Sequence, residues 1–299
     1  MGLLSRKELH EAIRDDLADR NSWDTRQSMF YRMRHNGLRR KNKPWPGASD
    51  AHFPLSDTVI QRLAPFYFQQ MFATDLIAQF TPIRDKTTAY ANAAAQWFDY
   101  QLKQKSNIET EILSVIDFML MSGRGVIKTY WDHDKKQLVF QNIDPQHIIV
   151  PTWTRNLQDA DRIVHVQHYS EEAYRRNELF SQDEGLIKRI KGAGTDVRGD
   201  NIKVQAQYQR EGLTYNEEDY IIVWEVWCRD EDGAWYCETF SPLRPNEDIR
   251  KAYKLGKGYG NKHPFSQFEY EVKDGRWYSP RGVTEIVAVH EAELTKLLN

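Results

Sequence analysis

The stretch IETEILSVIDFMLMSGRGVIKTYWD, residues 108–132, contains the change of hydrophobic period that decides the fold class. As far as Leu120, apolar residues recur at steps of three and four, which is the spacing of one broad helix face. Gly123, Arg124 and Gly125 interrupt this pattern, and from Gly125 onward apolar and polar residues alternate as in a β-strand. The sequence therefore predicts a helix that ends at these glycines and a strand that begins directly after them.

Helical patterns dominate the chain before this point. Residues 5 to about 35 are predicted to form one long polar helix that Ser5 caps, and its apolar stripe is so thin that it needs another surface to lie on. Two further helices are predicted at residues 55–74, where Pro65 is a kink or first-turn residue, and at the alanine-rich residues 86–104. We therefore expect residues 1–125 to be a mainly helical N-terminal part.

Hairpins dominate the chain after this point. GVIKTYWDHDKKQLVFQNID, residues 125–144, predicts one hairpin, and the aromatic residues 220–240 predict another about an Asp232-Gly233 turn. If those two residues form the loop, Cys228 faces Cys237 across the hairpin. We expect buried, reduced thiols at both positions because a cytoplasmic disulfide is rare.

This order of elements predicts an α+β fold, with N-terminal helices followed by antiparallel hairpins and then a helix. Residues 126–278 are expected to form a β-rich body with a mobile loop near 191–201, and residues 279–299 begin a further helix. That helix has no cap, which predicts that a longer natural chain is cut there. The mean hydropathy of −0.73 indicates much exposed surface, as in an elongated subunit that relies on partner subunits.

Composition argues against several classes of protein. A formal net charge of −2 and a pI of about 6.5 argue against a dedicated duplex-DNA binder, although DNA could still pass such a chain without being gripped. Two cysteines provide neither a disulfide framework nor a four-cysteine zinc site. No apolar run approaches the ~20 residues that span a bilayer, and the charged start is unlike a signal peptide. We expect a reducing cytoplasmic setting and no membrane partner.

A search for catalytic motifs gives no fingerprint of an enzyme. The chain has no Gly-x-Ser-x-Gly elbow, no His-Glu-x-x-His helix and no P-loop. The triplet Asp132-His133-Asp134 is typical of a hairpin turn in which aspartates bond to their own backbone, and GKGYGNK, residues 256–262, is typical of a loop. We therefore expect no catalytic residue, no metal and no cofactor.

Two other functional classes remain open from the sequence. In one, Asp132, Asp134 and Asp144 form the dispersed acidic site of an intracellular, metal-dependent nucleic-acid-processing enzyme. In the other, the aromatic hairpins of an adaptor module bind a partner protein.

A basic run, RMRHNGLRRKNK, follows two aromatic residues and precedes a tryptophan. Basic residues mixed with aromatic ones can bind nucleic acid, but they also suit the negative end of a helix dipole. We favour a solvated or intersubunit surface over direct contact with nucleic acid. The candidate contact residues are Arg32, Arg34, Arg39, Arg40, Lys41 and Lys43.

Several longer landmarks follow one another in a fixed order. They are YRMRHNGLRRKNKPWPGASDAHFP, VIQRLAPFYFQQMF, QFTPIRD, LSVIDFMLMSGRGVIKTYWD, FQNIDPQHIIVPTW and YSPRGVTEIVAVHEAELTKLLN. The series resembles the N-terminal portion of tailed-bacteriophage portal proteins, which are the head-to-tail connectors of the virion. The match covers essentially all 299 residues. Its strongest piece is the motif Pro44, Trp45, Pro46, Gly47, Ala48, Ser49 and Asp50.

The resemblance implies an elongated portal-type subunit in a homo-oligomeric ring, usually a dodecamer, at one capsid vertex. Such a ring is the channel for packaging and ejecting double-stranded DNA. It is also the docking platform for the terminase motor and the seat of tail adaptors, next to capsid and scaffolding proteins. Family members have no catalytic site and are assembled in the host cytoplasm. A near-neutral chain suits this role, because each phosphate neutralised by Lys or Arg would resist movement of the DNA.

Within this picture PWPGASD is a structural link between the long N-terminal helix and the body. Pro44 and Pro46 limit backbone freedom, and Gly47 permits a close crossing of two segments. Trp45 would bury a large surface where the helix meets the body.

Replacing Trp45 by alanine tests this role. If the indole is buried, the substitution costs about 3–5 kcal/mol of stability. We expect Trp45→Ala to lose ring assembly or solubility, measured by size-exclusion chromatography, without changing any ligand-binding constant. A soluble and correctly assembled variant would refute the structural role.

Overall fold

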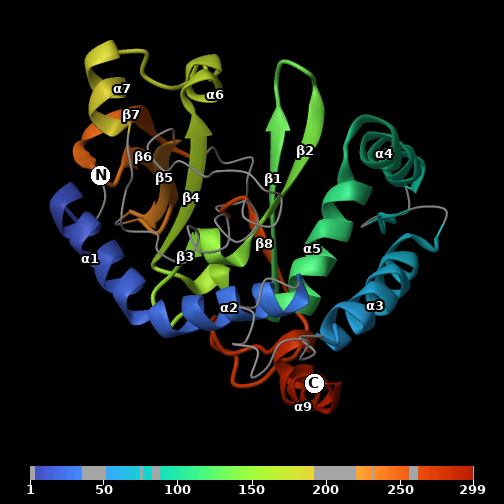
Figure 1. Ribbon diagram of the computed structural model, residues 1–299. Coiled ribbons are helices and arrows are strands. Elements are labelled where there is room, and N and C mark those ends of the chain that lie inside the picture. The colour runs from blue at the N-terminus through green and yellow to red at the C-terminus, as the bar shows by residue number, and fades with distance from the viewer. Residues whose placement is uncertain are drawn as a thin grey trace.

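The computed structural model describes residues 4–35, 52–74, 77–82, 88–191, 220–230, 232–255 and 262–298. These ranges have a mixed α+β architecture with antiparallel sheets and a C-terminal helix (Figure 1). The predicted fold class and the predicted order of helices and strands are therefore confirmed. In the described ranges, no helix is long and apolar enough to cross a membrane.

The described helices and strands have the following bounds. The helices are α1 (Arg6–Asp19), α2 (Asn21–Arg34), α3 (Leu55–Phe72), α4 (Thr88–Tyr100), α5 (Ile108–Ser122), α6 (Glu171–Arg176), α7 (Glu184–Ile190) and α9 (Val283–Leu298). The strands are β1 (Arg124–Asp132), β2 (Gln137–Ile143), β3 (Ile148–Ile149), β4 (Arg162–Ser170), β5 (Tyr220–Arg229), β6 (Trp235–Ser241), β7 (Arg244–Lys254) and β8 (Phe265–Glu269).

Two antiparallel sheets form the centre of the molecule. One has the strand order β2-β1-β8 and the other has the order β3-β4-β5-β6-β7. Figure 1 shows α5 beside the smaller sheet with α3 and α4 further out, α1 beside the larger sheet, and α2 running beneath both. The sheets meet at an apolar cluster that includes Val126, Trp227, Phe265 and Trp277.

The helical and strand segments share their cores. Leu9 and Ile13 of α1 pack on the larger sheet, whereas Val283 of α9 joins the core that α3 and α5 form on the smaller sheet. The thin apolar stripe of the first predicted helix is therefore buried against the larger sheet, as expected.

The single helix predicted over residues 5–35 is wrong, because the chain breaks at Arg20 into α1 and α2. The Arg20 guanidinium is buried and donates to the carbonyls of Ile148 at 2.7 Å and Gln146 at 2.6 Å. These partners lie far away in the sequence, so the helical period gave no sign of the break. The predicted cap is confirmed, since Ser5 and Glu8 form a reciprocal capping box.

The predicted facing of Cys228 and Cys237 is also wrong. Cys228 pairs with Tyr236 and Cys237 with Trp227, because the hairpin loop is one residue longer than predicted. Gly233 sits in this loop with a φ of +75°. A shift of one residue turns the side chains to opposite faces of the sheet, so the thiols lie in different cores. Both thiols are free and buried, as predicted.

Two predicted loops fall mainly outside the described residues. Of the segment near 191–201, only Lys191 is described, where it forms a bridge to Ile221. Of GKGYGNK, only Lys262 is described.

Two chain segments cross closely at the predicted end of the helix. Gly123 ends α5 with a φ of +88°, and a Cβ added to it would lie 2.6 Å from the carbonyl oxygen of Pro280. A Cβ added to Gly282 would overlap the carbonyl of Met121. The segment that leads into α9 therefore passes against the end of α5 with no space for a side chain.

The buried side chain of Arg124 connects the segments that meet at this crossing. Its buried guanidinium lies 4.6 Å from the ring centre of Trp277 and donates to the carbonyls of Trp277 at 2.8 Å and Arg276 at 3.0 Å. It also pairs with Glu269 of β8. One side chain thus holds the start of β1, the end of β8 and the segment before α9.

Alanine substitutions at two glycines separate the effect of this crossing from that of backbone strain. Gly123→Ala and Gly275→Ala both place alanine at positive φ, which costs about 1–2 kcal/mol. Only Gly123 meets neighbouring atoms, because no heavy atom lies within 4 Å of a Cβ on Gly275. We expect Gly123→Ala to lower the free energy of unfolding by at least about 2 kcal/mol more than Gly275→Ala in urea denaturation. Equal losses would contradict the close crossing.

Candidate functional site

The predicted site residues lie only partly within the described structure. The motif from Pro44 to Asp50 is outside it, as are the candidate contact residues Arg39, Arg40, Lys41 and Lys43. Arg32 and Arg34 are described and lie in the last turn of α2. The contact role of the basic run remains a prediction.

Arg34 has partners within the chain. Its two Nη atoms donate to the two carboxylate oxygens of Asp117 on α5 at 2.5 and 2.6 Å, and its Nε donates to Asp57 on α3 at 3.3 Å. The side chain is only 8% exposed. A two-pronged pair of this kind is strong and geometrically specific, so Arg34 joins three helices. Arg32 is half-buried, and its Nε donates to the carbonyl of Ser28 at 3.4 Å.

The described residues on either side of the predicted link lie close together. α2 ends at Arg34, and the described chain resumes at His52, whose Nε2 lies 3.1 Å from the carbonyl oxygen of Met33. The same Nε2 lies 2.9 Å from Oε1 of Glu291 on α9. Met33, which precedes the motif, and His52, which follows it, are therefore neighbours.

Glu291 also completes the start of α3. Its Oε2 accepts from the backbone N–H of Ser56 at 2.8 Å, and the Glu291 side chain is fully buried. No side chain of its own caps α3 at Pro54. A carboxylate is favourable at the positive end of a helix and satisfies a backbone donor that would otherwise have no partner. α2, α3 and α9 thus meet at one junction, next to the predicted link.

A second group of polar side chains is buried between the two sheets. Lys128 of β1 lies 2.6 and 2.7 Å from the two carboxylate oxygens of Glu225 on β5. Trp227 Nε1 and Gln167 Nε2 also donate to this carboxylate, at 3.0 and 3.2 Å. His165 Nδ1 lies 3.4 Å from it. The group ties β1 to β4 and β5 through one buried charge pair.

Burial and charge set the protonation of this group. Burial alone would raise the pKa of Glu225, but the Lys128 ammonium and the hydrogen bond from His165 hold it well below its usual range. Burial lowers the pKa of His165 from 6.5 to about 4, against the opposing effect of Glu225. At neutral pH the group therefore contains an ionised Glu225 carboxylate and a neutral His165 imidazole.

This group of polar side chains was not predicted from the sequence. One signal was present, because Glu225 is the single charged residue in the apolar run YIIVWEVW. Lys128 holds a similar place in GVIKTYW. An isolated charge in a strand that is buried on both faces requires a partner. The sequence did not reveal that these two residues are each other's partners.

The acidic residues of the enzyme hypothesis do not come together. Asp132 accepts from the backbone N–H groups of Asp134 and Lys135 at 3.0 Å each, in the predicted hairpin turn. Asp144 caps a short turn beyond the other end of β2. Asp132 lies at one end of β2 and Asp144 at the other, and the seven residues of this strand span about 20 Å. In the ranges that the structure describes, no cluster of three or more histidines, cysteines and carboxylates could hold a metal ion.

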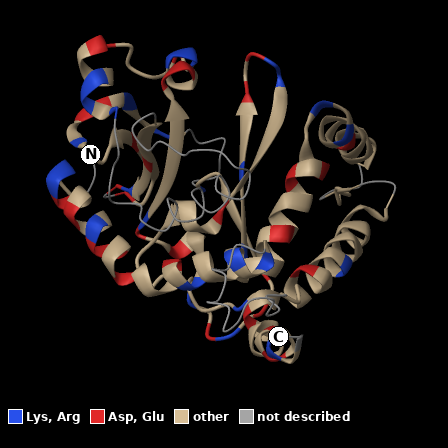
Figure 2. Ribbon diagram, in the orientation of Figure 1, with Lys and Arg blue, Asp and Glu red and all other residues tan. Residues whose placement is uncertain are grey.

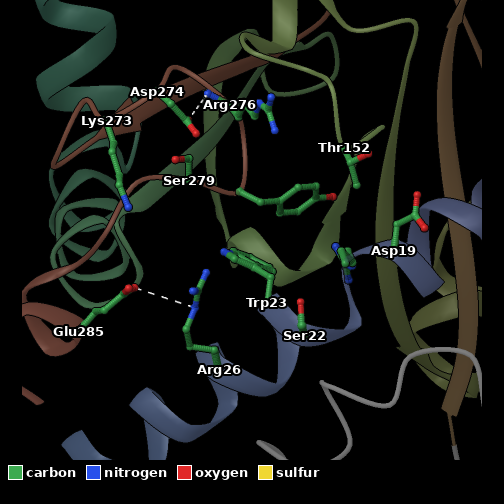
Figure 3. A pocket seen from close by; sticks show the side chains of 12 residues that line it. Asp19, Ser22, Trp23, Arg26, Thr152, Lys273, Asp274, Arg276, Ser279 and Glu285 are labelled. Atoms are coloured by element: carbon green, nitrogen blue, oxygen red, sulfur yellow. Dashed lines mark hydrogen bonds and ion pairs between the residues drawn. The ribbon is translucent and has the colours of Figure 1, made fainter.

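The described surface includes a polar hollow and an apolar one. A polar one of about 350 Å³ lies between the break of α1 and α2, the loop 273–279 and the start of α9 (Figure 3). An apolar one of about 340 Å³ lies between α3, α5 and β8, with Tyr67, Met71, Met119, Phe268 and Tyr270 in its wall.

No protein family model matches this chain, and no curated protein matches it as a relative.

The buried histidine predicts a specific dependence of stability on pH. The unfolded chain binds a proton at His165 near pH 6.5, whereas the folded chain resists it down to about pH 4. The free energy of unfolding therefore falls as the pH drops through this window. At about pH 5 the contribution of His165 is a loss of about 2 kcal/mol. Urea denaturation of His165→Gln, which keeps a polar group beside Glu225, should show a correspondingly weaker loss between pH 7 and 5.

His133→Gln is the matched control, because His133 is exposed at the hairpin tip. It should keep the pH dependence of the wild type. Equal pH dependence in His165→Gln and the wild type would contradict a buried, neutral imidazole.

Proposed function

We propose that this chain is the N-terminal body of a tailed-bacteriophage portal protein. In this role it is a structural subunit of a homo-oligomeric, dodecameric ring at one vertex of the capsid. The observation that carries the proposal is the ordered series of landmarks along the whole sequence, with PWPGASD, residues 44–50, as the strongest.

The partners follow from this role. The ring is the channel through which double-stranded DNA passes, without sequence specificity, during packaging and ejection. It docks the terminase motor on one side and tail adaptors on the other, within the virion. The subunit performs no catalysis, since the terminase supplies the ATP hydrolysis.

Exposed aromatic residues on α3 and α4 support the proposal that this chain assembles with other copies of itself. On α3 and α4, Phe66 is 52% exposed, Tyr90 78%, Trp97 52% and Tyr100 48%. Figure 2 shows few charged residues along these two helices. Aromatic residues are enriched at the centres of interfaces between proteins. In a ring, each subunit contacts its two neighbours through two different faces, so such a flank would be one of them.

Charge pairs within the chain support the proposal that the subunit is rigid. Arg34–Asp117, Arg124–Glu269 and Lys128–Glu225 each join elements that are distant in sequence. Arg124–Glu269 and Lys128–Glu225 are the more buried of these pairs, and breaking a buried pair by removing one partner typically costs about 3–5 kcal/mol. Moving the elements that these two pairs join is therefore energetically unfavourable. A channel subunit that transmits load from a packaging motor requires such stiffness.

Light scattering after size-exclusion chromatography tests the assembly. We expect the wild type to form a closed multiple of the 35.3 kDa chain. Tyr90→Ala/Trp97→Ala should raise the concentration needed for assembly about tenfold or more, because each 1.4 kcal/mol of lost contact energy is a factor of ten. The melting temperature of the unassembled subunit should change little, since Tyr90 is 78% and Trp97 52% exposed.

Leu179→Ala is the matched control, because Leu179 is 60% exposed but lies between α6 and α7, away from α3 and α4. It should assemble as the wild type does. A wild type that remains monomeric at every concentration would refute the proposed ring, and normal assembly of the double variant would refute the aromatic interface.

A further inference from the structure

The outward face of α4 is an apolar stripe. Its residues recur at steps of three and four, so they lie on one side of the helix, and all of them are exposed. They are Tyr90, Ala93, Ala94, Trp97 and Tyr100. The helix buries only Ala95 against its own subunit. A helix that buries so little of its apolar surface within its own chain has a face available for a partner.

An apolar pocket of about 340 Å³ lies elsewhere on the same subunit, between α3, α5 and β8. Its floor consists of Val115, Ile116 and Met119 of α5, which are buried, and Met71 of α3 lies at its opening with 43% of the residue exposed. The volume corresponds to about eleven water molecules at about 30 Å³ each, which is close to the number of non-hydrogen atoms in a tryptophan side chain.

The chemistry of the pocket favours an aromatic occupant. Met71 and Met119 contribute two thioether sulfurs, and Tyr67, Phe268 and Tyr270 contribute three rings. Contacts between a methionine sulfur and an aromatic ring are favourable, and aromatic pairs stabilise a contact beyond the area that they bury.

The charges of the stripe and of the pocket are compatible with contact between them. Asp99 is the single charged residue of α4, and it already accepts from the backbone N–H of Ile77 and lies 3.1 Å from Nζ of Lys103. Among the described residues that line the pocket, only Glu269 is charged, and it pairs with Arg124. Neither surface would therefore bring an unpaired charge into the contact, which avoids the main cost of burying it.

The stripe and the pocket lie on different parts of the subunit. Figure 1 shows α4 on the other side of α5 from β8. The ring of Trp97 lies 6.4 Å from that of Trp131 on β1, whereas Phe268 in the pocket wall pairs with Gly125 on the same strand. These two positions on β1 are about 20 Å apart along the strand. Trp97 is therefore remote from the pocket of its own subunit.

We propose that Trp97 of one copy of this chain occupies the apolar pocket between α3, α5 and β8 of the next copy. Ala93 and Ala94 leave room for α4 to approach the opening at Met71. Tryptophan at the centre of an interface, in a pocket that excludes water, is typical of the residues that contribute most to binding. Two complementary surfaces at different places on one subunit form a heterologous contact, which closes into a ring when the rotation permits. This inference rests on the proposed ring and names the two surfaces that meet in it.

Substitutions at the opening of the pocket test this contact by light scattering after size-exclusion chromatography. Met71→Glu places a charge against the incoming indole, so the concentration needed for assembly should rise at least about tenfold. Met71→Leu keeps the opening apolar and should assemble as the wild type does. Met29→Glu is the matched control, because Met29 on α2 is also 43% exposed but does not line the pocket. Normal assembly of Met71→Glu would overturn the role of the pocket and leave the ring proposal standing.

Mixing two variants tests whether the two surfaces bind each other. Trp97→Ala keeps the pocket intact, and Met71→Glu keeps the indole. At a concentration at which neither assembles alone, an equimolar mixture should form a dimer of twice the 35.3 kDa chain. This dimer should not grow, because both of its remaining surfaces are altered, and its formation would also show that both variants are folded.

Three other outcomes are distinguishable. A mixture that forms no dimer would overturn the pairing of Trp97 with the pocket. Loss of assembly in Trp97→Ala but not in Met71→Glu would indicate a contact between two α4 helices and would also overturn it. A wild type that stays monomeric at every concentration would refute the ring, and this contact with it.

Discussion

The close crossing of the chain at Gly123 and Gly282 is the constraint on which the rest of the structure depends. α5 must stop there, because a side chain at either glycine would overlap the backbone of the other segment. The same crossing starts β1 in the direction that brings it between β2 and β8. It also sends the chain into α9, so that Glu291 reaches the start of α3. The polar pocket exists because the loop 273–279 is held beside the break between α1 and α2.

Buried charges then fix how the elements sit around this crossing. Arg124 holds the crossing itself, and Lys128–Glu225 joins the two sheets. Arg34–Asp117 joins α2 to α5 at the point where the predicted link begins. Buried pairs do not add much net stability compared with a well-packed apolar core, but an element that shifts would leave a charge without its partner. The price of such pairs in desolvation therefore favours one arrangement over its alternatives.

Local patterns predicted the elements well, and they failed where distant residues decide the outcome. The helix that ends at Gly123 and the hairpin about Asp132 were predicted because glycine position and period are local signals. The break at Arg20 was missed because its partners follow about 130 residues later, as the 128-residue separation from Ile148 shows. The predicted strand pairing of the hairpin that contains Cys228 was wrong by one residue, because turn residues alone do not determine the length of a hairpin loop. The candidate link at Pro44–Asp50 lies outside the described residues.

Together these features describe a subunit with buried charge pairs between its elements and with exposed aromatic residues, among them Phe66, Tyr90 and Trp97, on α3 and α4. The central claim is that such subunits close into a ring around a channel. Negative-stain electron microscopy of the purified protein measures this most directly, because it shows symmetry and not only mass. The account predicts closed rings with a central hole wide enough for a DNA duplex. Compact particles without a hole, or open chains of variable length, would contradict it.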